Sequence, residues 1–181
     1  MAALGGRHEQ VRAVAGLLCG EGHLDDELVH VNHAKGEQIE DYNEVVVASD
    51  FAKFVQGFKD ESLSINMRPG RVPQTTYWMI DAGGYAGRIS IRHVLNENLL
   101  KLGGHIGYSV RPTKRGLGYG KTALRIVLPK AKALGITKAL LTCDATNIAS
   151  KKIIEGNGGV LENEVPGEAG KPNKLRYWIT L

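Results

Sequence analysis

Apolar positions along this chain repeat with two different periods, and the two periods predict different elements. Alternating or continuous apolar runs, rich in β-branched and aromatic residues, predict strands. The predicted strands cover residues 27–31, 75–80, 85–94, 105–110, 138–143, 160–165 and 175–181. Gly83 and Gly84 separate the second strand from the third, so those two strands should form an antiparallel hairpin.

Apolar residues at helical spacing predict helices between several of these strands. The predicted helices cover residues 36–47, 50–58, 117–134 and 145–159, and the linker 95–104 has room for one helical turn. In the second of these helices Phe51, Phe54 and Phe58 should share one buried face. Pro129 lies inside the longest helix, where a missing hydrogen bond predicts a kink, and Gly135 is well placed to end that helix.

The order of these elements predicts the fold class. A hairpin comes first, and strands then alternate with helices, which is typical of an α/β (α+β) domain with a mixed central sheet and helices on both faces. The chain has 181 residues, of which 43% are apolar, so one domain over 27–181 is expected. Residues 1–26 are expected to be an N-terminal extension with a weak helical pattern at Val11, Val14, Leu17 and Leu18.

Charge and cysteine content exclude several kinds of protein. A net charge of +4 and a pI near 9.1 are mildly basic, too weak for a nucleic-acid-binding patch. Cys19 and Cys143 are too few for a disulfide framework, and the spacing of Cys19 with His23, His30 and His33 fits no compact zinc site. We therefore expect a cytoplasmic protein without a metal, a membrane span or nucleic acid, either monomer or homodimer.

Residues 104–122, GHIGYSVRPTKRGLGYGKT, join a predicted strand to a predicted helix through a glycine-rich loop. Backbone N–H groups at a helix N-terminus bind phosphate oxygens without help from side chains. A P-loop would need glycine where Arg115 stands, and Gly116, Gly118 and Gly120 do not have the spacing of a dinucleotide fingerprint. The stretch therefore predicts a phosphorylated cofactor of another kind.

The segment Arg115 to Gly120 matches the pattern R/Q-x-x-G-x-G/A, and it resembles the cofactor loop of the Gcn5-related N-acetyltransferases (GNAT). The preceding strand, the following helix and the later segment NIASKKIIEGNGG are similar in order and spacing over residues 70–165, and loosely over 27–181. The resemblance implies a mostly antiparallel sheet, splayed at the strand 105–110. It also implies that the loop binds the pyrophosphate of acetyl-CoA.

Carried onto this sequence, the resemblance implies a set of cofactor contacts. These are Tyr108, Val110, Arg115, Gly116, Gly118, Gly120, Lys121, Asn147 and Ser150. Tyr108 and Val110 would offer backbone groups to the pantetheine arm, and one of their amides would polarise the thioester carbonyl. Arg111 and Lys114 are further cations near the loop, and a solvated charged face is an equal alternative for each cation. For Asn147, helix capping is the alternative.

At the positions of the catalytic acid and base, this sequence departs from the pattern of the family. Many members of the family place a tyrosine as general acid where this chain has Ile154, so the acid is absent, unneeded, or supplied by Tyr108 or Tyr119. His105 is the first candidate for the base and His93 the second, because an imidazole titrates in the range that suits an ammonium. Packing within a strand is the alternative for both histidines.

The sequence thus predicts an acetyl-CoA-dependent N-acetyltransferase that transfers the acetyl group directly to a primary amine. We expect a small-molecule acceptor, with a protein amine as the other choice. The acceptor should meet the helices before residue 60 and the loops 66–76 and 166–173. A non-catalytic CoA-binding sensor or interaction module is the alternative, and Ile154 is the residue that favours it.

Overall fold

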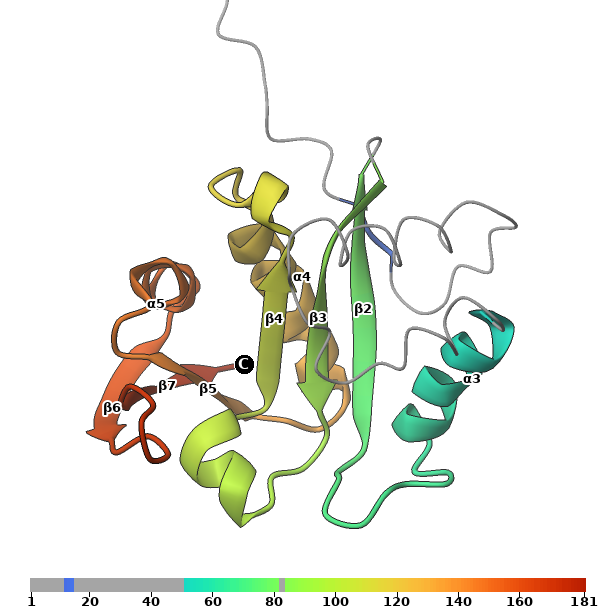
Figure 1. Ribbon diagram of the computed structural model, residues 1–181, viewed down its shortest axis with the longest axis horizontal. Coiled ribbons are helices and arrows are strands. Elements are labelled where there is room, and N and C mark those ends of the chain that lie inside the picture. The colour runs from blue at the N-terminus through green and yellow to red at the C-terminus, as the bar shows by residue number, and fades with distance from the viewer. Residues whose placement is uncertain (1–11, 15–50, 82–83) are drawn as a thin grey trace, which may run out of the picture.

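A computed structural model describes residues 12–14, 51–81 and 84–181 (Figure 1). The predictions of a strand at 27–31 and a helix at 36–47 lie outside the described residues, as does most of the segment 1–26. The domain boundary expected near residue 26 stays a prediction for the same reason.

The first sheet holds four antiparallel strands in the order β1-β2-β3-β4. They are β1 (Arg12–Val14), β2 (Gln74–Asp81), β3 (Gly84–Arg92) and β4 (Ile106–Val110). The hairpin of β2 and β3 was predicted and is confirmed. The helical pattern predicted around Val11 is wrong at residues 12–14, which pair with β2 along its outer edge. Pairing with a sheet edge overrides a weak local preference.

The second sheet holds three antiparallel strands in the order β5-β7-β6. They are β5 (Lys138–Asp144), β6 (Val160–Val165) and β7 (Lys174–Thr180), close to the predicted ranges. Figure 1 shows β4 and β5 as the neighbouring strands of the two sheets, fanning away from each other. The predicted fold class, an α/β domain with a sheet splayed at the strand 105–110, is confirmed.

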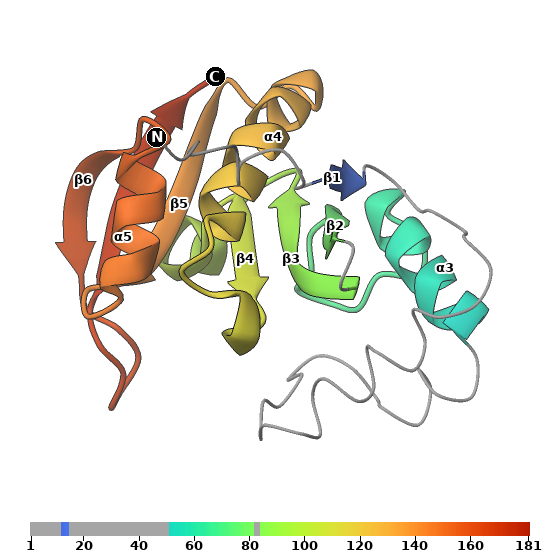
Figure 2. The same ribbon diagram turned by 90° about the horizontal axis from the view of Figure 1, so that it is seen from above.

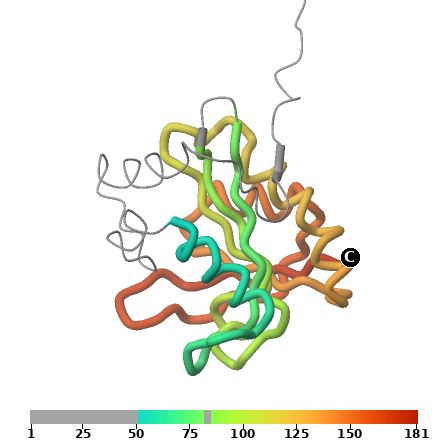
Figure 3. Tube along the Cα trace, turned by 90° about the vertical axis from the view of Figure 1, so that its right-hand side faces the viewer, coloured from blue at the N-terminus to red at the C-terminus, as the bar shows by residue number. Residues whose placement is uncertain are grey.

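Helices cover both faces of the first sheet. The long helix α4 (Tyr119–Ala133) packs on β3 and β4 and contacts α5 (Ile148–Glu155), as Figure 2 shows. On the other face α3 (Phe51–Ser62) sets Phe51, Phe54 and Phe58 around Trp78 of β2, with ring centroids about 6 Å apart. The shared face predicted for these phenylalanines therefore contacts the sheet. Figure 3 shows α3 in front of β2 and β3 from the side.

Two short helical turns complete the described chain. They are η1 (Leu99–Gly103), a π-helical turn in the predicted linker, and η2 (Pro112–Lys114), a 3-10 turn before the glycine-rich loop. Among the helices in the described ranges none is long and apolar enough to cross a membrane. The main core lies between α4 and the two sheets and includes Met79, Ile89, Leu124, Leu141 and Tyr177.

Helix α4 runs through Pro129, so the proline does not end it; the kink expected there stays a prediction. The helix ends as predicted at Gly135, which has a φ of 86°. The amide of Gly135 donates to the carbonyl of Lys132, and the amide of Ile136 donates to that of Ala131. This Schellman pair satisfies two terminal carbonyls and turns the chain toward β5.

Gly104 joins the two sheets. It forms an antiparallel bridge with Leu141 of β5, and its φ of 72° with ψ of 179° falls in a backbone region open almost only to glycine. An added Cβ would lie 2.6 Å from the carbonyl oxygen of Leu140. The absence of a side chain at this position is therefore what lets β4 and β5 meet.

We expect Gly104→Ala to lower the free energy of unfolding in urea by about 3 kcal/mol, from backbone strain and overpacking together. Gly170→Ala is the matched control, because Gly170 has a φ of 76° but no heavy atom within 4 Å of the added Cβ. That control should lose about 1 kcal/mol. Equal losses would show that close packing at the junction does not matter.

Candidate functional site

The gap between β4 and β5 is closed at one end by His105. The amide of His105 donates to the carbonyl of Leu140 at 2.7 Å, and the amide of Leu140 donates back to Nδ1 of the His105 ring at 2.9 Å. The side chain thus takes the place of a backbone carbonyl in a strand pair. Arg92 supports this junction, because its guanidinium donates to the carbonyl of Gly104 at 3.0 Å.

Beyond His105 the two strands separate, and we call the gap between β4 and β5 the split. The backbone of β4 has groups that point into it. The backbone amide of Arg92 donates to the carbonyl of His105, and the backbone amide of Arg111 donates to the carbonyl of Ala86. The odd-numbered residues of this stretch therefore bond to β3. Since a strand alternates the direction of its backbone groups, those of Tyr108 and Val110 face away from β3. Within the described residues β4 forms no ladder with β5, so these groups line the split.

The glycine-rich loop lies at the wide end of the split, directly after β4 and η2. Residues 115–118 are exposed, and Gly116 and Gly118 have φ values of 77° and 89°, which side chains rarely adopt. Gly118 is the N-cap of α4, and the first intrahelical bond runs from the amide of Thr122 to the carbonyl of Gly118. The amides of residues 118–121 therefore have no acceptor within the helix and are available to an anion.

The cations near the loop differ in their surroundings. Arg115 donates through Nε to the carbonyl of Val110 at 3.0 Å, so it spans the mouth of the split. Lys121 is exposed on the first turn of α4. Lys114 instead forms an ion pair with Asp81 at 2.7 Å, which makes it a structural group rather than an open phosphate ligand. Arg111 lies near the carbonyl of Tyr85, at 3.4 Å.

Tyr108 connects β4 to α5 across the split. Its hydroxyl hydrogen-bonds to Oγ of Ser150 at 2.7 Å. Asn147 is the N-cap of α5, and its Oδ1 accepts from the amide of Ser150 at 3.0 Å. The capping role considered for Asn147 is therefore present, and the residue is exposed. The structure thus brings Tyr108, Ser150 and Asn147 together, and their contact with a cofactor stays a prediction.

Burial shifts the ionisation of the groups around the split. It raises the pKa of Tyr108 to about 12, although the bond with Ser150 acts in the opposite direction. Burial, and then the positive charge of Arg92, lower the pKa of His105. Burial also raises the pKa of the Cys143 thiol on β5. At neutral pH, Tyr108 and Cys143 therefore keep their protons, and His105 is uncharged.

Other candidate residues lie away from the split. His93, the second candidate base, bonds through Nε2 to Thr75 at 2.8 Å at the far end of the hairpin. Ile154 is fully buried in the core and offers no polar atom to the site. Within the described ranges, no three side chains of the metal-binding kinds gather together.

Sequence reasoning missed two charged residues that support the site. Arg92 and Asp81 both stand within predicted strands or directly after them, and neither was singled out. A charged residue at the end of an apolar strand was the available signal for Asp81, and a charged residue inside one was the signal for Arg92. Their partners, the carbonyl of Gly104 and the side chain of Lys114, come from segments that the pattern did not connect.

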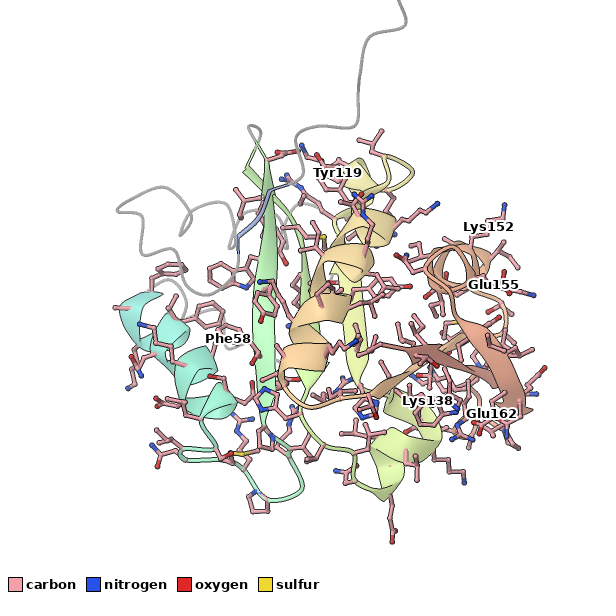
Figure 4. All side chains as sticks on the ribbon, turned by 180° about the vertical axis from the view of Figure 1, so that it is seen from behind. Phe58, Tyr119, Lys138, Lys152, Glu155 and Glu162 are labelled. Atoms are coloured by element: carbon pink, nitrogen blue, oxygen red, sulfur yellow. The ribbon has the colours of Figure 1, made fainter. Side chains whose placement is uncertain are left out.

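A pocket of about 300 Å³ lies under α3, on the face of the first sheet opposite α4. Its lining includes Phe54, Phe58, Asp60 and Glu61 of α3, together with Arg88 of β3 and residues of the loop 65–71. Figure 4 shows Phe58 on the side of α3 that faces the sheet. The second of the two early helices and the loop 66–76 belong to the region where the sequence predicts the acceptor, whereas the loop 166–173 does not line this pocket.

Several solved structures with the same fold are acetyltransferases. The microcin self-immunity acetyltransferase MccE, solved with acetyl-CoA and AMP, has a TM-score of 0.65 at 15% identity, covering 96% of this chain and 93% of that chain. Spermidine N-acetyltransferase SpeG from Vibrio cholerae, in a mutant form, has a TM-score of 0.58 at 16% identity, covering 94% of both chains.

A third structure is the acetyltransferase from Salmonella typhimurium that modifies the N-terminal serine of a 50S ribosomal subunit protein. It has a TM-score of 0.58 at 21% identity, again covering 94% of both chains. At these identities the likeness is one of fold. No curated protein sequence matches the chain.

The family model described as the acetyltransferase (GNAT) domain matches residues 27–160, well over half of the sequence. Among the described elements this match spans α3 to α5, and it includes the split, the glycine-rich loop and α4. The chain belongs to the GNAT family and is an acetyltransferase.

Proposed function

We propose that the protein transfers an acetyl group from acetyl-CoA directly to a primary amine of a small molecule. One observation carries this proposal: the backbone groups of Tyr108 and Val110 line a split that leads to the open amides at the start of α4. A long, thin ligand with a pyrophosphate at one end fits both features. Acetyl-CoA supplies the acetyl thioester.

Acetyl-CoA would be held mainly by the backbone. The amides of residues 118–121 would bind the pyrophosphate, with Arg115 and Lys121 as nearby cations. Tyr108 and Val110 would pair with the amide groups of the pantetheine arm, as a neighbouring strand would. The carbonyl of Val110 would exchange its bond with Arg115 for that pairing. Asn147 and Ser150 would lie along the α5 side of the arm.

Tyr108 is the best-placed proton donor for the departing thiolate. Its hydroxyl lies over the split, and a pKa of about 12 means that it holds its proton at neutral pH. The other tyrosine considered, Tyr119, has its hydroxyl bonded to Asp81. An amide of β4 would polarise the thioester carbonyl, and the bound geometry would supply the rest of the rate enhancement.

The bonding of His105 favours a structural role over the proposed base. Its Nδ1 accepts from Leu140, so in the neutral ring the proton is on Nε2 and the free lone pair is already used. Taking a further proton would break the bond that joins the sheets. We propose that His105 holds the closed end of the split, and that the amine loses its proton to water.

The pocket under α3 supports a small acceptor. A volume of about 300 Å³ suits a small molecule, and Asp60 and Glu61 provide carboxylates that would attract an ammonium group. Arginines also belong to the lining, so the acceptor would carry polar groups besides the amine. Among proteins of this fold, one is named for spermidine and one for a ribosomal protein, so a peptide N-terminus is the competing acceptor.

The non-catalytic CoA-binding module considered from the sequence is not favoured, because the chain belongs to a family of acetyltransferases. Ile154, on which that alternative rested, is a fully buried apolar side chain where many family members place a catalytic tyrosine, so the proton donor would be another residue. We still expect a cytoplasmic protein, because the chain has few cysteines. We also expect a monomer or a homodimer.

Release of CoA thiol from acetyl-CoA in the presence of polyamines, amino-acid amides and short peptides tests the function. We expect turnover with at least one small amine. Gly118→Val should lose CoA binding, because Gly118 has a φ of 89°, whereas Gly170→Val, with a φ of 76° far from the loop, should bind normally. Tight CoA binding without turnover on any amine would favour the sensor, and peptide turnover alone would replace the acceptor class.

We expect Tyr108→Phe to lower kcat about 10- to 100-fold and to change the KM for acetyl-CoA little, because the backbone contacts remain. Steady-state kinetics with the best amine measure both values. Tyr177→Phe is the matched control: Tyr177 is also buried, with its hydroxyl bonded to Glu155 at 3.2 Å, and lies on β7. An unchanged kcat in Tyr108→Phe would remove Tyr108 as the acid.

His105→Asn separates the two roles of His105, since the amide oxygen of asparagine can accept from Leu140 but does not titrate. The lowered pKa of His105 means that the unfolded chain binds the proton more readily, so wild-type stability should fall as the pH drops below about 6.5. His105→Asn should keep most of the activity and lose part of this pH dependence in urea unfolding. His105→Leu should lose about 1–3 kcal/mol of stability. A folded but inactive His105→Asn protein would make His105 the base.

A further inference from the structure

We propose that Asp81 is a positioning residue for acetyl-CoA: its carboxylate holds both ends of the glycine-rich loop against the central sheet. The inference rests on the function proposed above and assigns a role to a residue outside the expected contacts. Asp81 would not touch the cofactor. It would act through Lys114 and Tyr119.

The position of Asp81 follows from the alternation of β2. Tyr77 and Met79 project toward α4, and Asp81 continues the same stripe at the end of the strand. A carboxylate therefore stands where an apolar residue would otherwise extend the core. Its side chain is only 10% exposed, so it requires partners to offset the cost of burial.

Those partners flank the loop on both sides. Lys114 is the last residue of η2, directly before Arg115, and its Nζ lies 2.7 Å from Oδ2 of Asp81. Tyr119 is the first residue of α4, directly after Gly118, and its hydroxyl donates to the same oxygen. Nζ of Lys114 also lies 6.0 Å from the centre of the Tyr119 ring. Figure 4 shows Tyr119 on the same side of the molecule as the end of β2.

The three groups form a neutral unit. The hydrogen bond with Asp81, followed by burial, raises the pKa of Tyr119 to about 12, so the hydroxyl remains a donor at neutral pH. The charge of Lys114 balances that of Asp81. A buried carboxylate next to a pyrophosphate site is therefore tolerated, and Arg115 and Lys121 remain as the cations that face the ligand.

Holding both ends of the segment 115–118 reduces the cost of ordering it. This segment is exposed, and it contains two glycines with positive φ, so on its own it would sample many conformations. Fixing Tyr119 also fixes the direction of the first turn of α4, and thus of the amides that would meet the pyrophosphate. The loop is therefore preorganised, and CoA binding loses less conformational entropy.

Two explanations of Asp81 predict opposite signs for Asp81→Asn. If the carboxylate acted only through its charge, its removal would strengthen the binding of the polyanionic CoA. If Asp81 positions the loop, its removal weakens the binding, because a charge-assisted hydrogen bond and an ion pair are lost. The sign of the change in the dissociation constant decides between them.

Isothermal titration of CoA into wild type, Asp81→Asn, Tyr119→Phe and the double variant tests the proposal, with steady-state kinetics on the same proteins. We expect Asp81→Asn to raise the Kd for CoA and the KM for acetyl-CoA about tenfold, with kcat and the KM for the amine within about twofold. The double variant should be weaker than wild type by less than the product of the single effects, because both changes break the same contact.

Glu162→Gln is the matched control. Glu162 forms an ion pair with Arg176 at 2.9 Å on the outer strand β6, and Figure 4 places it far from Tyr119. This variant should leave the Kd for CoA unchanged. Thermal unfolding in the absence of CoA shows whether Asp81→Asn is folded; if it is not, Tyr119→Phe and Lys114→Met carry the test, each with an expected rise in Kd.

Equal or tighter CoA binding by folded Asp81→Asn, or by both partner variants, would overturn the positioning role while leaving the proposed function intact. Wild type that does not bind CoA at all would overturn the proposed function itself, and this inference with it. A fall in kcat without a change in KM would also count against the proposal, since it would place Asp81 in the chemistry rather than in the holding of the loop.

Discussion

The structure depends on a single meeting point between two strands. Backbone N–H and C=O groups inside a protein require partners, and adjacent strands normally provide them along their whole length. Here β4 pairs along its whole length with β3, but within the described part of the chain it is joined to β5 by backbone pairing only around Gly104 and His105. Beyond that point, the facing edges of β4 and β5 form no ladder of backbone hydrogen bonds within the described residues. The gap is the feature that the loop, the helix N-terminus and α5 surround.

A few local contacts fix the width of the gap between β4 and β5. Gly104 lets the backbones approach, and the ring of His105 fills the role of one missing carbonyl. Arg92 binds the carbonyl of Gly104 from the neighbouring strand, and the bond between Tyr108 and Ser150 fixes the distance to α5. None of these contacts is large in energy, each being about 1 kcal/mol or a little more. Together they make the width of the gap a property of the fold before any ligand is bound.

Much of this arrangement could be read from the sequence, because it follows from local rules. Alternation and helical spacing gave β2 to β7, α4 and α5 close to their observed ranges, and Gly135 marked the end of α4. The glycine pattern and the following helix were enough to place an exposed loop before α4, for which phosphate binding is our proposal. The pairing of residues 12–14 with β2 was not readable, because three residues carry too little pattern to outweigh a long-range contact.

The supporting contacts were not readable for a different reason. Asp81 and Lys114 are 33 residues apart, and Tyr108 and Ser150 are 42 apart, so no local period relates them. His105 was recognisable as a residue of interest, but not the direction in which its ring points. The bond from Leu140 to Nδ1 depends on the register of two strands that the sequence does not align. Which atom of a histidine is free is a tertiary property.

The closed end of the gap has a consequence for whether another polypeptide strand can add to the sheet. Exposed strand edges invite other strands to add to a sheet, and proteins usually cover or charge such edges. An inserted strand would need about 4.8 Å on each side along its whole length. Because the amide of His105 bonds to the carbonyl of Leu140, β4 and β5 are already joined at that end, and an added strand could not run between them along the whole length of β4. A ligand short enough to pair with Tyr108 and Val110 alone meets no such limit, so the geometry that leaves this backbone open also restricts what can bind to it.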